Sequence, residues 1–422
     1  MLALTPLIFF ICVYLGISIA LGDFYKVPIS VAFMFTSIVS ICVSKGTLKH
    51  RIKVFSRGGG SENMMLMIWI FILAGAFANS AKEMGSINDM VNITLSLVPS
   101  DTIYAGLFLA SAVISLSIGT SVGTIVAVMP IAVGISAAIG SGTPYIAAIV
   151  VGGALFGDNL SFISDTTVCA TQSQGCKMSD KFKTNMRIAA PAAMLVLIYY
   201  AVMGTGVNSP GELPSANFLK VMPYVVVLIT AMLGVNVLIV LTLGILLTGI
   251  VGLCYGDYTV TTWFKALADG TMGMGELIII TMLAGGVLEV IRANGGIRFL
   301  MDKILKHVHS ERTAELSIGA LVSVVDICTA NNTVAIITVS GIARDISNRF
   351  HLDPRRVASI LDTFSCIMQG IIPYGAQMLM GAALAGINPV QIIPHLYYPY
   401  ILLLFSIAAI MIGRRKKKVT GK

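Results

Sequence analysis

Long apolar segments dominate this chain and restrict how it can fold. Charged residues make up only 11% of the 422 residues, whereas soluble domains carry about 25%. Crossing a bilayer takes roughly 20 mostly apolar residues as a helix, and lipid leaves backbone polar groups no partner outside the helix. The apolar segments that meet this description are 2–21, 27–44, 63–80, 101–140, 143–171, 187–205, 217–233, 235–254, 275–292, 314–343, 356–386 and 391–412. The sequence therefore predicts an all-α polytopic membrane protein without a large soluble domain.

Two of these segments are too long for one simple crossing. As a helix the 101–140 segment would be about 60 Å long, twice the hydrocarbon thickness. It is interrupted at 119–124, and the 314–343 segment is interrupted at 329–333. We expect two helical hairpins, beside broken helices at 143–171 and 356–386 and about 10 full spans in all. A pair of short spans in place of each hairpin would fit the loop charges equally well.

The distribution of Lys and Arg predicts the orientation, because cytoplasmic loops are enriched in these residues. Five basic clusters are expected in the cytoplasm: Lys45 to Arg57; Lys177, Lys181, Lys183 and Arg187; Arg292 to Arg312; Arg344 to Arg356; and the tail at 413–422. Segments near 22–26, 81–100, 206–219, 255–274 and 387–395 are expected outside. This places a multi-pass protein in the cell (inner) membrane with both termini cytoplasmic. The first apolar segment lacks a basic leader and is expected to be a retained span.

The two halves of the chain resemble one another. Leu73-Ala74-Gly75 is echoed 210 residues later by Leu283-Ala284-Gly285, and the interruption at 120–124 lines up with that at 329–333. An odd number of crossings per half would invert the second half, so we predict a first repeat at 1–205 and a second, inverted repeat at 217–412. Paired interruptions in inverted repeats are typical of the binding site of secondary transporters.

Acidic residues within apolar segments mark functional positions, because burying them in lipid is costly. In the first half, Asp158 and Asp165 lie in a polar segment at 157–167 whose carboxylate, amide and hydroxyl oxygens suit a hard monovalent cation. Asp165 could instead cap the second half-helix, and Asp158 could lie at a water-facing helix end. The predicted ligands of an ion or substrate here are Thr120, Ser121, Thr124, Asp158, Asn159, Ser161, Ser164, Asp165 and Thr166.

The second half carries a similar but less acidic set. Its predicted ligands are Asp326, Thr329, Asn331, Asn332 and Thr333. Asp326 could bind an ion or cap the break in the hairpin. Asp362 lies deeper in an apolar segment, either as a proton-coupling carboxylate or as one buried against Thr and Ser hydroxyls. Gln377 roughly matches Asp165, so that a neutral amide would make the two half-sites chemically unequal.

Several function classes lack support in the sequence. It contains no phosphate-binding loop, Ser/His/Asp set, metal-ligand spacing or CxxC pair, which argues against an enzyme or a bound cofactor. The basic residues lie between apolar segments, which argues against a nucleic-acid partner. A channel would need a continuous polar pore, whereas the polar groups gather at two breaks.

The segment from Gly157 to Thr167 resembles the Gly-Asp-x-x-Ser-Pro-x-Ser-Asp-Thr-Thr segment of NhaC-type sodium/proton antiporters, and 119–124 is similar to their Gly-Thr-Ser-Trp-Gly-Thr segment. Phe162, Asn159 and Val122 depart from the common Pro, Lys and Trp of those segments. The resemblance implies an elevator-type carrier with Na+ and H+ as coupling ions and a homodimer in lipid. From the residues themselves we expect sodium at Asp158 and Asp165, with Asp362 and Asp165 as the candidates for proton exchange. Because some members move organic acids or amino acids, a carrier of an amino acid or small carboxylate is the alternative.

Overall fold

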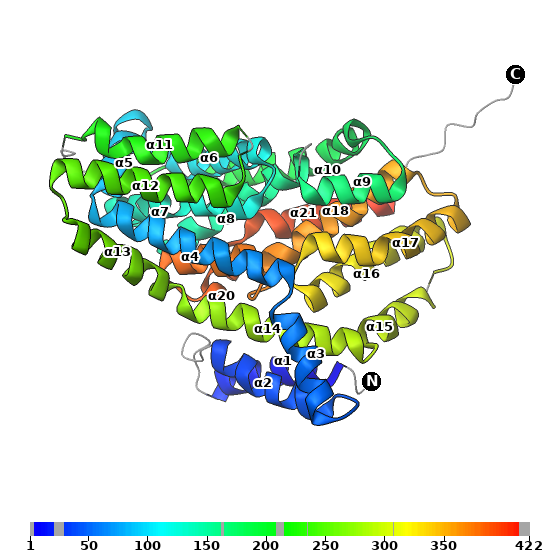
Figure 1. Cartoon of the computed structure of the whole chain (residues 1–422). Coiled ribbons are helices and arrows are strands. Elements are labelled where there is room, and N and C mark those ends of the chain that lie inside the picture. The colour runs from blue at the N-terminus through cyan, green and yellow to red at the C-terminus, as the bar shows by residue number, and fades with distance from the viewer. Residues whose placement is uncertain are drawn as a thin grey trace, which may run out of the picture.

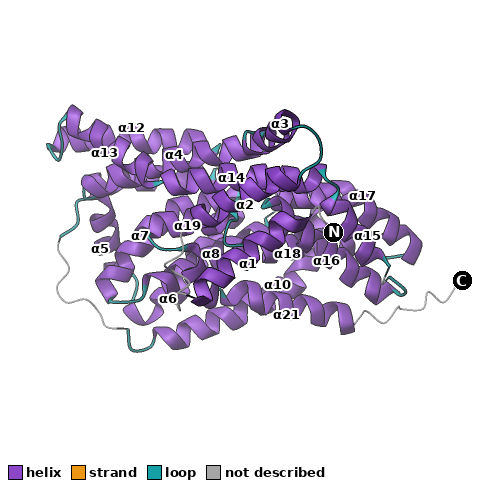
Figure 2. Cartoon of the chain, turned by 90° about the horizontal axis from the view of Figure 1, so that it is seen from below, coloured by secondary structure: helices purple, strands orange, loops and turns teal. Residues whose placement is uncertain are grey.

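The computed structural model describes residues 4–20, 29–161, 164–207, 215–233, 235–306 and 308–412. Within these ranges the chain is helical, with no strand (Figure 2). The predicted basic tail at 413–422 and the position of Phe162 lie outside the described residues.

The helices of the first half follow the predicted segments and add shorter ones between them. They are α1 (Thr5–Ala20), α2 (Ile29–Val43), α3 (Leu48–Gly59), α4 (Glu62–Glu83), α5 (Ser86–Leu97), α6 (Ile103–Ile118), α7 (Ser121–Ile139), α8 (Thr143–Leu160), α9 (Asp165–Gln174) and α10 (Met178–Gly204), with a 3-10 turn at Ser100–Thr102.

The second half repeats this order. Its helices are α11 (Phe218–Met232), α12 (Val237–Tyr255), α13 (Val260–Gly273), α14 (Gly275–Ala293), α15 (Gly296–Leu305), α16 (Glu311–Thr329), α17 (Asn332–Phe350), α18 (Pro354–Ile371), α19 (Ala376–Ala385), α20 (Pro389–Ile392) and α21 (Tyr397–Ile412), with a 3-10 turn at Ile393–His395. Each half therefore has a short connecting helix, a long helix, a helix pair and a broken helix in the same succession (Figure 1).

The breaks fall where the sequence predicts them. Helix α6 ends at Gly119, and α16 ends at Ala330; both residues have left-handed backbone, with φ of 76° and 48°. Helices α8 and α9 are separated at 161–164, and α18 and α19 at 372–375. The chain thus reverses or bends at four places, and polar residues at these places or in the adjoining helix turns form the site described below.

The two halves pack into one another. Helix α3 of the first half packs against α14 of the second, and α13 of the second packs against α4 of the first. A glycine pair lies at each contact: a Cβ on Gly285 would meet the carbonyl oxygen of Gly58, and one on Gly270 would meet that of Gly75. Small residues let helix backbones approach closely where lipid provides no hydrophobic driving force between helices.

Seven helical segments of the described chain are long and apolar enough to cross a membrane, or eight if one bent pair is a single span. Ile29–Val43, Ile103–Ile118 and Phe218–Thr230 are shorter apolar helices. The expected span at 391–412 is not one straight helix, because residues 389–395 and α21 meet at a bend of 53°. The span expected at 187–205 begins earlier, at Met178. Helices α3, α5, α13 and α15 lie where the sequence suggests loops, because they are short or amphipathic.

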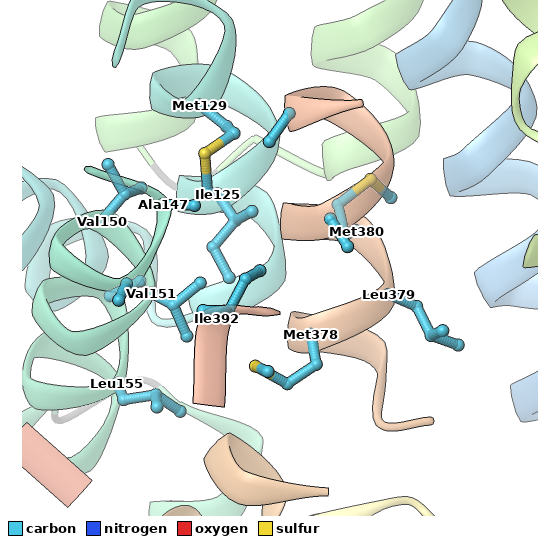
Figure 3. Packing of buried hydrophobic residues seen from close by; sticks show 14 of the residues in the cluster. Ile125, Met129, Ala147, Val150, Val151, Leu155, Met378, Leu379, Met380 and Ile392 are labelled. Carbon is cyan, nitrogen blue, oxygen red and sulfur yellow. The ribbon is translucent and has the colours of Figure 1, made fainter. Parts of the chain in front are cut away.

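Apolar packing holds the second broken helix against the first half. Helix α19 packs on α7 and α8, and Figure 3 shows Met378 on the side of α19 that faces Val151 and Leu155 of α8, with Ile125 and Met129 of α7 nearby. All five are buried. This contact fixes the start of α19 next to the start of α7, which brings their polar residues together.

Candidate functional site

Two hairpin tips and two helix breaks surround one cavity of about 160 Å³. Its polar lining comes from both halves: Thr120, Ser121, Asp158, Ser164, Asp165 and Thr166 from the first, and Asn331, Asn332, Thr333, Gln369 and Gln377 from the second. Helix α4 closes it on one side with Leu66, Met67, Ile70 and Phe71. The structure thus places the two predicted polar interruptions against each other.

Asp158 is the innermost carboxylate of the cavity, and its side chain is held by hydrogen bonds from two serines. The Ser121 hydroxyl donates to one carboxylate oxygen at 2.7 Å and the Ser164 hydroxyl to the other at 2.6 Å. The Ser121 backbone N–H, at the start of α7, adds a bond of 3.3 Å. These three hydrogen bonds fix both oxygens of the Asp158 carboxylate at the start of α7.

Two glutamine side chains from the second half also line the cavity. Because the Ser121 hydroxyl proton points to Asp158, Ser121 must accept from the Gln377 amide nitrogen, 2.9 Å away. The Gln369 amide nitrogen likewise donates to the Ala330 carbonyl at 3.1 Å. These hydrogen bonds establish which atom of each amide is the nitrogen and which is the oxygen. Both amide oxygens are buried without a hydrogen-bond partner. Unpartnered oxygens beside a carboxylate are the groups that a bare cation would ligate.

The remaining predicted residues of the lining occupy the ends of helices. Asp165 is the first residue of α9 and is exposed, while Ser164 is the residue before that helix. The capping role suggested for Asp165 is therefore wrong. Asn331 caps α17 by accepting from the Val334 backbone N–H at 2.9 Å, so Asp326 does not cap this break either.

Several predicted residues lie near the cavity without lining it. Thr124 and Thr329 bond to backbone carbonyls of their own hairpins, at 3.0 and 3.2 Å. The Ser161 hydroxyl donates to the Leu116 carbonyl at 3.0 Å and ties the broken helix to α6. Asp326 is fully buried, and neither of its carboxylate oxygens has a hydrogen-bond partner. These residues support the walls of the cavity.

An ion pair lies behind the cavity. Lys181 of α10 and Asp362 of α18 are both fully buried, with 2.6 Å between the ammonium and the carboxylate. The sequence suggests a cytoplasmic loop position for Lys181, and this is wrong because α10 begins at Met178 and turns Lys181 inward. The partners suggested for Asp362, Thr and Ser hydroxyls, are also wrong: its carboxylate accepts from Lys181 and, at 3.2 Å, from the Asn185 amide.

Comparison with known proteins places this arrangement in a family. The model of the Na+/H+ antiporter family matches residues 2–205 and 212–414. The chain belongs to the Na+/H+ antiporter family. It is accordingly a multi-pass membrane protein of a transporter family.

Curated relatives of this family member align along most of its length. The Na(+)/H(+) antiporter NhaC of Bacillus subtilis (strain 168) is 24% identical and aligns over 99% of this chain and 98% of its own. The Malate-2H(+)/Na(+)-lactate antiporter of the same organism is 22% identical, over 94% and 92%. The crystal structure of the Alcanivorax borkumensis YdaH transporter superposes with a TM-score of 0.40 and 11% identity, over 91% of this chain and 96% of that one.

Sequence reasoning about this family member missed Gln369, Lys181 and Asn185. The internal repeat could have identified Gln369, because this residue follows Asp158 by 211 residues and so occupies the equivalent position in the second half. Both residues line the cavity. Gln377 follows Thr166 by the same number, so it matches Thr166 and not Asp165 as the sequence suggests. Lys181 and Asn185 carry no such signal, since their partners are distant in the sequence.

Proposed function

We propose that this protein is a secondary active transporter that exchanges Na+ for H+ across the cell inner membrane, with both cations competing for Asp158. The observation that carries the proposal is one carboxylate held by two serine donors in a cavity that Gln369 and Gln377 also line, with the amide oxygens of both glutamines buried and without a hydrogen-bond partner. Sodium would occupy this position between Asp158, Gln369 and Gln377. Asp165, at the exposed side, would attract the cation and contribute to its ligation. No cofactor is needed, since the coupling ions carry the energy.

The charge of the lining favours a cation over an organic anion as cargo. Asp158 and Asp165 contribute carboxylates, and no Lys, Arg or His lines the cavity among the described residues. A malate or lactate ion would therefore meet negative charge without a cationic partner, and placing like charges together is unfavourable. An amino acid, whose ammonium could pair with Asp158, is the second candidate and would need a larger cavity than a sodium ion.

The orientation in the membrane is part of the proposal. Lys and Arg clusters at 45–57, 344–356 and in the C-terminal tail support cytoplasmic termini. A homodimer in lipid is the expected assembly, supported by the family resemblance alone.

The test is sodium-driven proton flux in everted vesicles from cells without their own Na+/H+ antiporters, read by the recovery of acridine fluorescence after NaCl addition. Wild-type protein should give recovery, and Asp158→Asn should abolish it, because an amide neither carries a proton nor neutralises a cation. Asp165→Asn should weaken it in the same direction. Asp101→Asn, an exposed carboxylate outside the cavity, is the matched control and should behave as wild type.

Full sodium-driven flux in Asp158→Asn would contradict the proposal. The alternative is measured in the same vesicles with radiolabelled amino acids, lactate and malate. Uptake of one of these solutes that depends on the protein, without sodium-driven proton flux, would replace ion exchange as the function.

A further inference from the structure

The buried Lys181 side chain joins both arms of the broken helix α8–α9. Its ammonium donates to the Asn159 carbonyl, in the last turn of α8, at 2.6 Å. It also donates to the Thr167 hydroxyl, in the first turn of α9, at 2.7 Å. The third contact is the carboxylate of Asp362 at 2.6 Å, from α18 of the second half. One side chain therefore fixes the break from both sides and ties it to the opposite repeat.

The three contacts define what Lys181 carries. The Thr167 hydroxyl gives its own proton to the Ser161 carbonyl at 2.8 Å, so it can only accept from Lys181. A carboxylate, a carbonyl and this hydroxyl are three acceptors, and they match the three N–H donors of a charged ammonium. The Asp362 oxygen that faces Lys181 also accepts from Asn185, while its other carboxylate oxygen is buried without a hydrogen-bond partner. The geometry therefore makes Asp362 the counter-ion of a Lys181 ammonium that is held at three points.

The ion pair is separated from the cavity by the chain of α8 itself. Asp158 points into the cavity, while the backbone carbonyl and amide oxygen of the next residue, Asn159, point to Lys181 and Asn185. Neither Lys181 nor Asp362 lines the cavity. A shift of the break would move Asp158 and the Ser164 hydroxyl that holds it, so the pair sets the position of the proposed cation ligand without touching the cation.

We propose that Lys181 is a positioning residue that clamps the α8–α9 break, and that Asp362 is its fixed counter-ion and not a carrier of the exchanged proton. This inference rests on the proposed function. It replaces the proton-coupling role that the sequence suggests for Asp362, and it leaves Asp158 as the carboxylate that exchanges one cation for another.

The test compares single and paired substitutions, because a fixed ion pair and a proton carrier respond differently to joint removal. Lys181→Met and Asp362→Leu each leave one buried charge without its partner, which strongly destabilises a protein, whereas apolar residues replacing both partners are often tolerated. We expect each single variant to lose thermal stability in detergent and to lose exchange in vesicles. The double variant should recover stability above both single variants and regain exchange. Lys183→Met, an exposed position on the same helix, is the matched control and should match wild type.

Transport by the double variant separates positioning from a purely structural role. Because the clamp on Asn159 and Thr167 is lost, we expect the KM for Na+ to rise about tenfold, a loss typical of removing a group that orients metal ligands. Lys181→Arg keeps the charge and should restore more of the Na+ affinity than Lys181→Met. A stable double variant without any exchange would overturn the proposal and make Asp362 a proton carrier. A double variant less stable than either single variant would overturn it too.

The failure of this inference can be told from failure of the proposed function. If wild-type protein shows no sodium-driven flux, the proposed function fails, yet the stability comparison of the four proteins still measures the ion pair. If wild-type protein exchanges and the stable double variant does not, only the inference fails.

Discussion

At the scale of single residues, hydrogen-bond direction defines the site. Gln377, which lines the cavity, donates its amide N–H to Ser121, and its buried amide oxygen has no hydrogen-bond partner. Gln377→Leu removes this oxygen at similar volume, so we expect a KM for Na+ raised by about tenfold, comparable to losing one ligand-positioning group, with a smaller change in maximal rate. Sodium titration of vesicle antiport measures both. Met380→Leu, on the same helix and also in the lining, should change neither, and an unchanged KM in Gln377→Leu would exclude this oxygen as a ligand.

Asp326 poses a different question, because its two carboxylate oxygens are buried without any partner. Burying a polar or charged group without a hydrogen bond costs about 1–3 kcal/mol or more. Asp326→Asn removes the charge at the same shape, and we expect a melting temperature equal to or above that of wild type. Asp302→Asn, exposed in α15, is the control and should show no change. A melting temperature several degrees lower in Asp326→Asn would instead indicate that the carboxylate binds a cation, as the sequence suggests.

The sequence predicts some of these residues better than others for a physical reason. Asp158, Asp165 and the polar tip at 331–333 are recognisable because oxygen-rich residues interrupt long apolar segments. The pairing of Lys181 with Asp362 is not, because charge counts assign a Lys near an apolar segment to the loop. Only the structure, in which α10 begins at Met178, shows that the Lys181 side chain is buried in the protein interior. The unpartnered amide oxygens depend on rotamers and donors from other helices, which no sequence pattern encodes.

At the scale of elements, the breaks were predictable and the short helices were not. A segment of 40 apolar residues must turn because the bilayer is about 30 Å thick, so the turn at Gly119 follows from length alone. Helices α3 and α13 lie outside the long apolar segments, so segment length relative to bilayer thickness does not predict them. Close packing at glycines is what positions these helices. Gly270 of α13 lies against the backbone of Gly75 in α4, and this contact can be recognised only from the structure.

This helix crossing gives a matched pair of substitutions within α13. Gly270→Ala would place a methyl group against the Gly75 carbonyl, and neither backbone can move aside easily. Gly273→Ala, three residues on, meets nothing within 4 Å. Alanine favours a helix over glycine by about 1 kcal/mol, so Gly273→Ala should keep or raise the melting temperature. Gly270→Ala should lower the melting temperature, because overpacking costs about 1–3 kcal/mol of folding stability. Equal melting temperatures for the two variants would show that the close contact does not constrain the fold.

At the scale of the whole molecule, the two halves form one body through exchanged contacts. Helices α2 and α3 pack on α14, and α12 and α13 pack on α4, so each half completes the packing of the other. The order of elements and the paired breaks recur in the two halves, while the inversion of the second repeat, at 217–412, relative to the first, at 1–205, stays a prediction. The sequence indicates this arrangement through loop charge alone, because an internal identity of a few residues does not report direction.

The inverted arrangement makes a direct prediction about loops that occupy equivalent places in the two halves. Leu97 ends α5 and is exposed, and His309 follows α15 and is exposed. If the second half is inverted, these positions lie on opposite sides of the membrane, with Leu97 outside and His309 in the cytoplasm beside the Lys303 and Arg312 cluster. Leu97→Cys and His309→Cys are each introduced after replacement of the seven native cysteines. A membrane-impermeant maleimide should label Leu97→Cys in intact cells and His309→Cys only in everted vesicles. Labelling of both from the same side would show that the halves are parallel, and the two breaks would then need another explanation for meeting in one cavity.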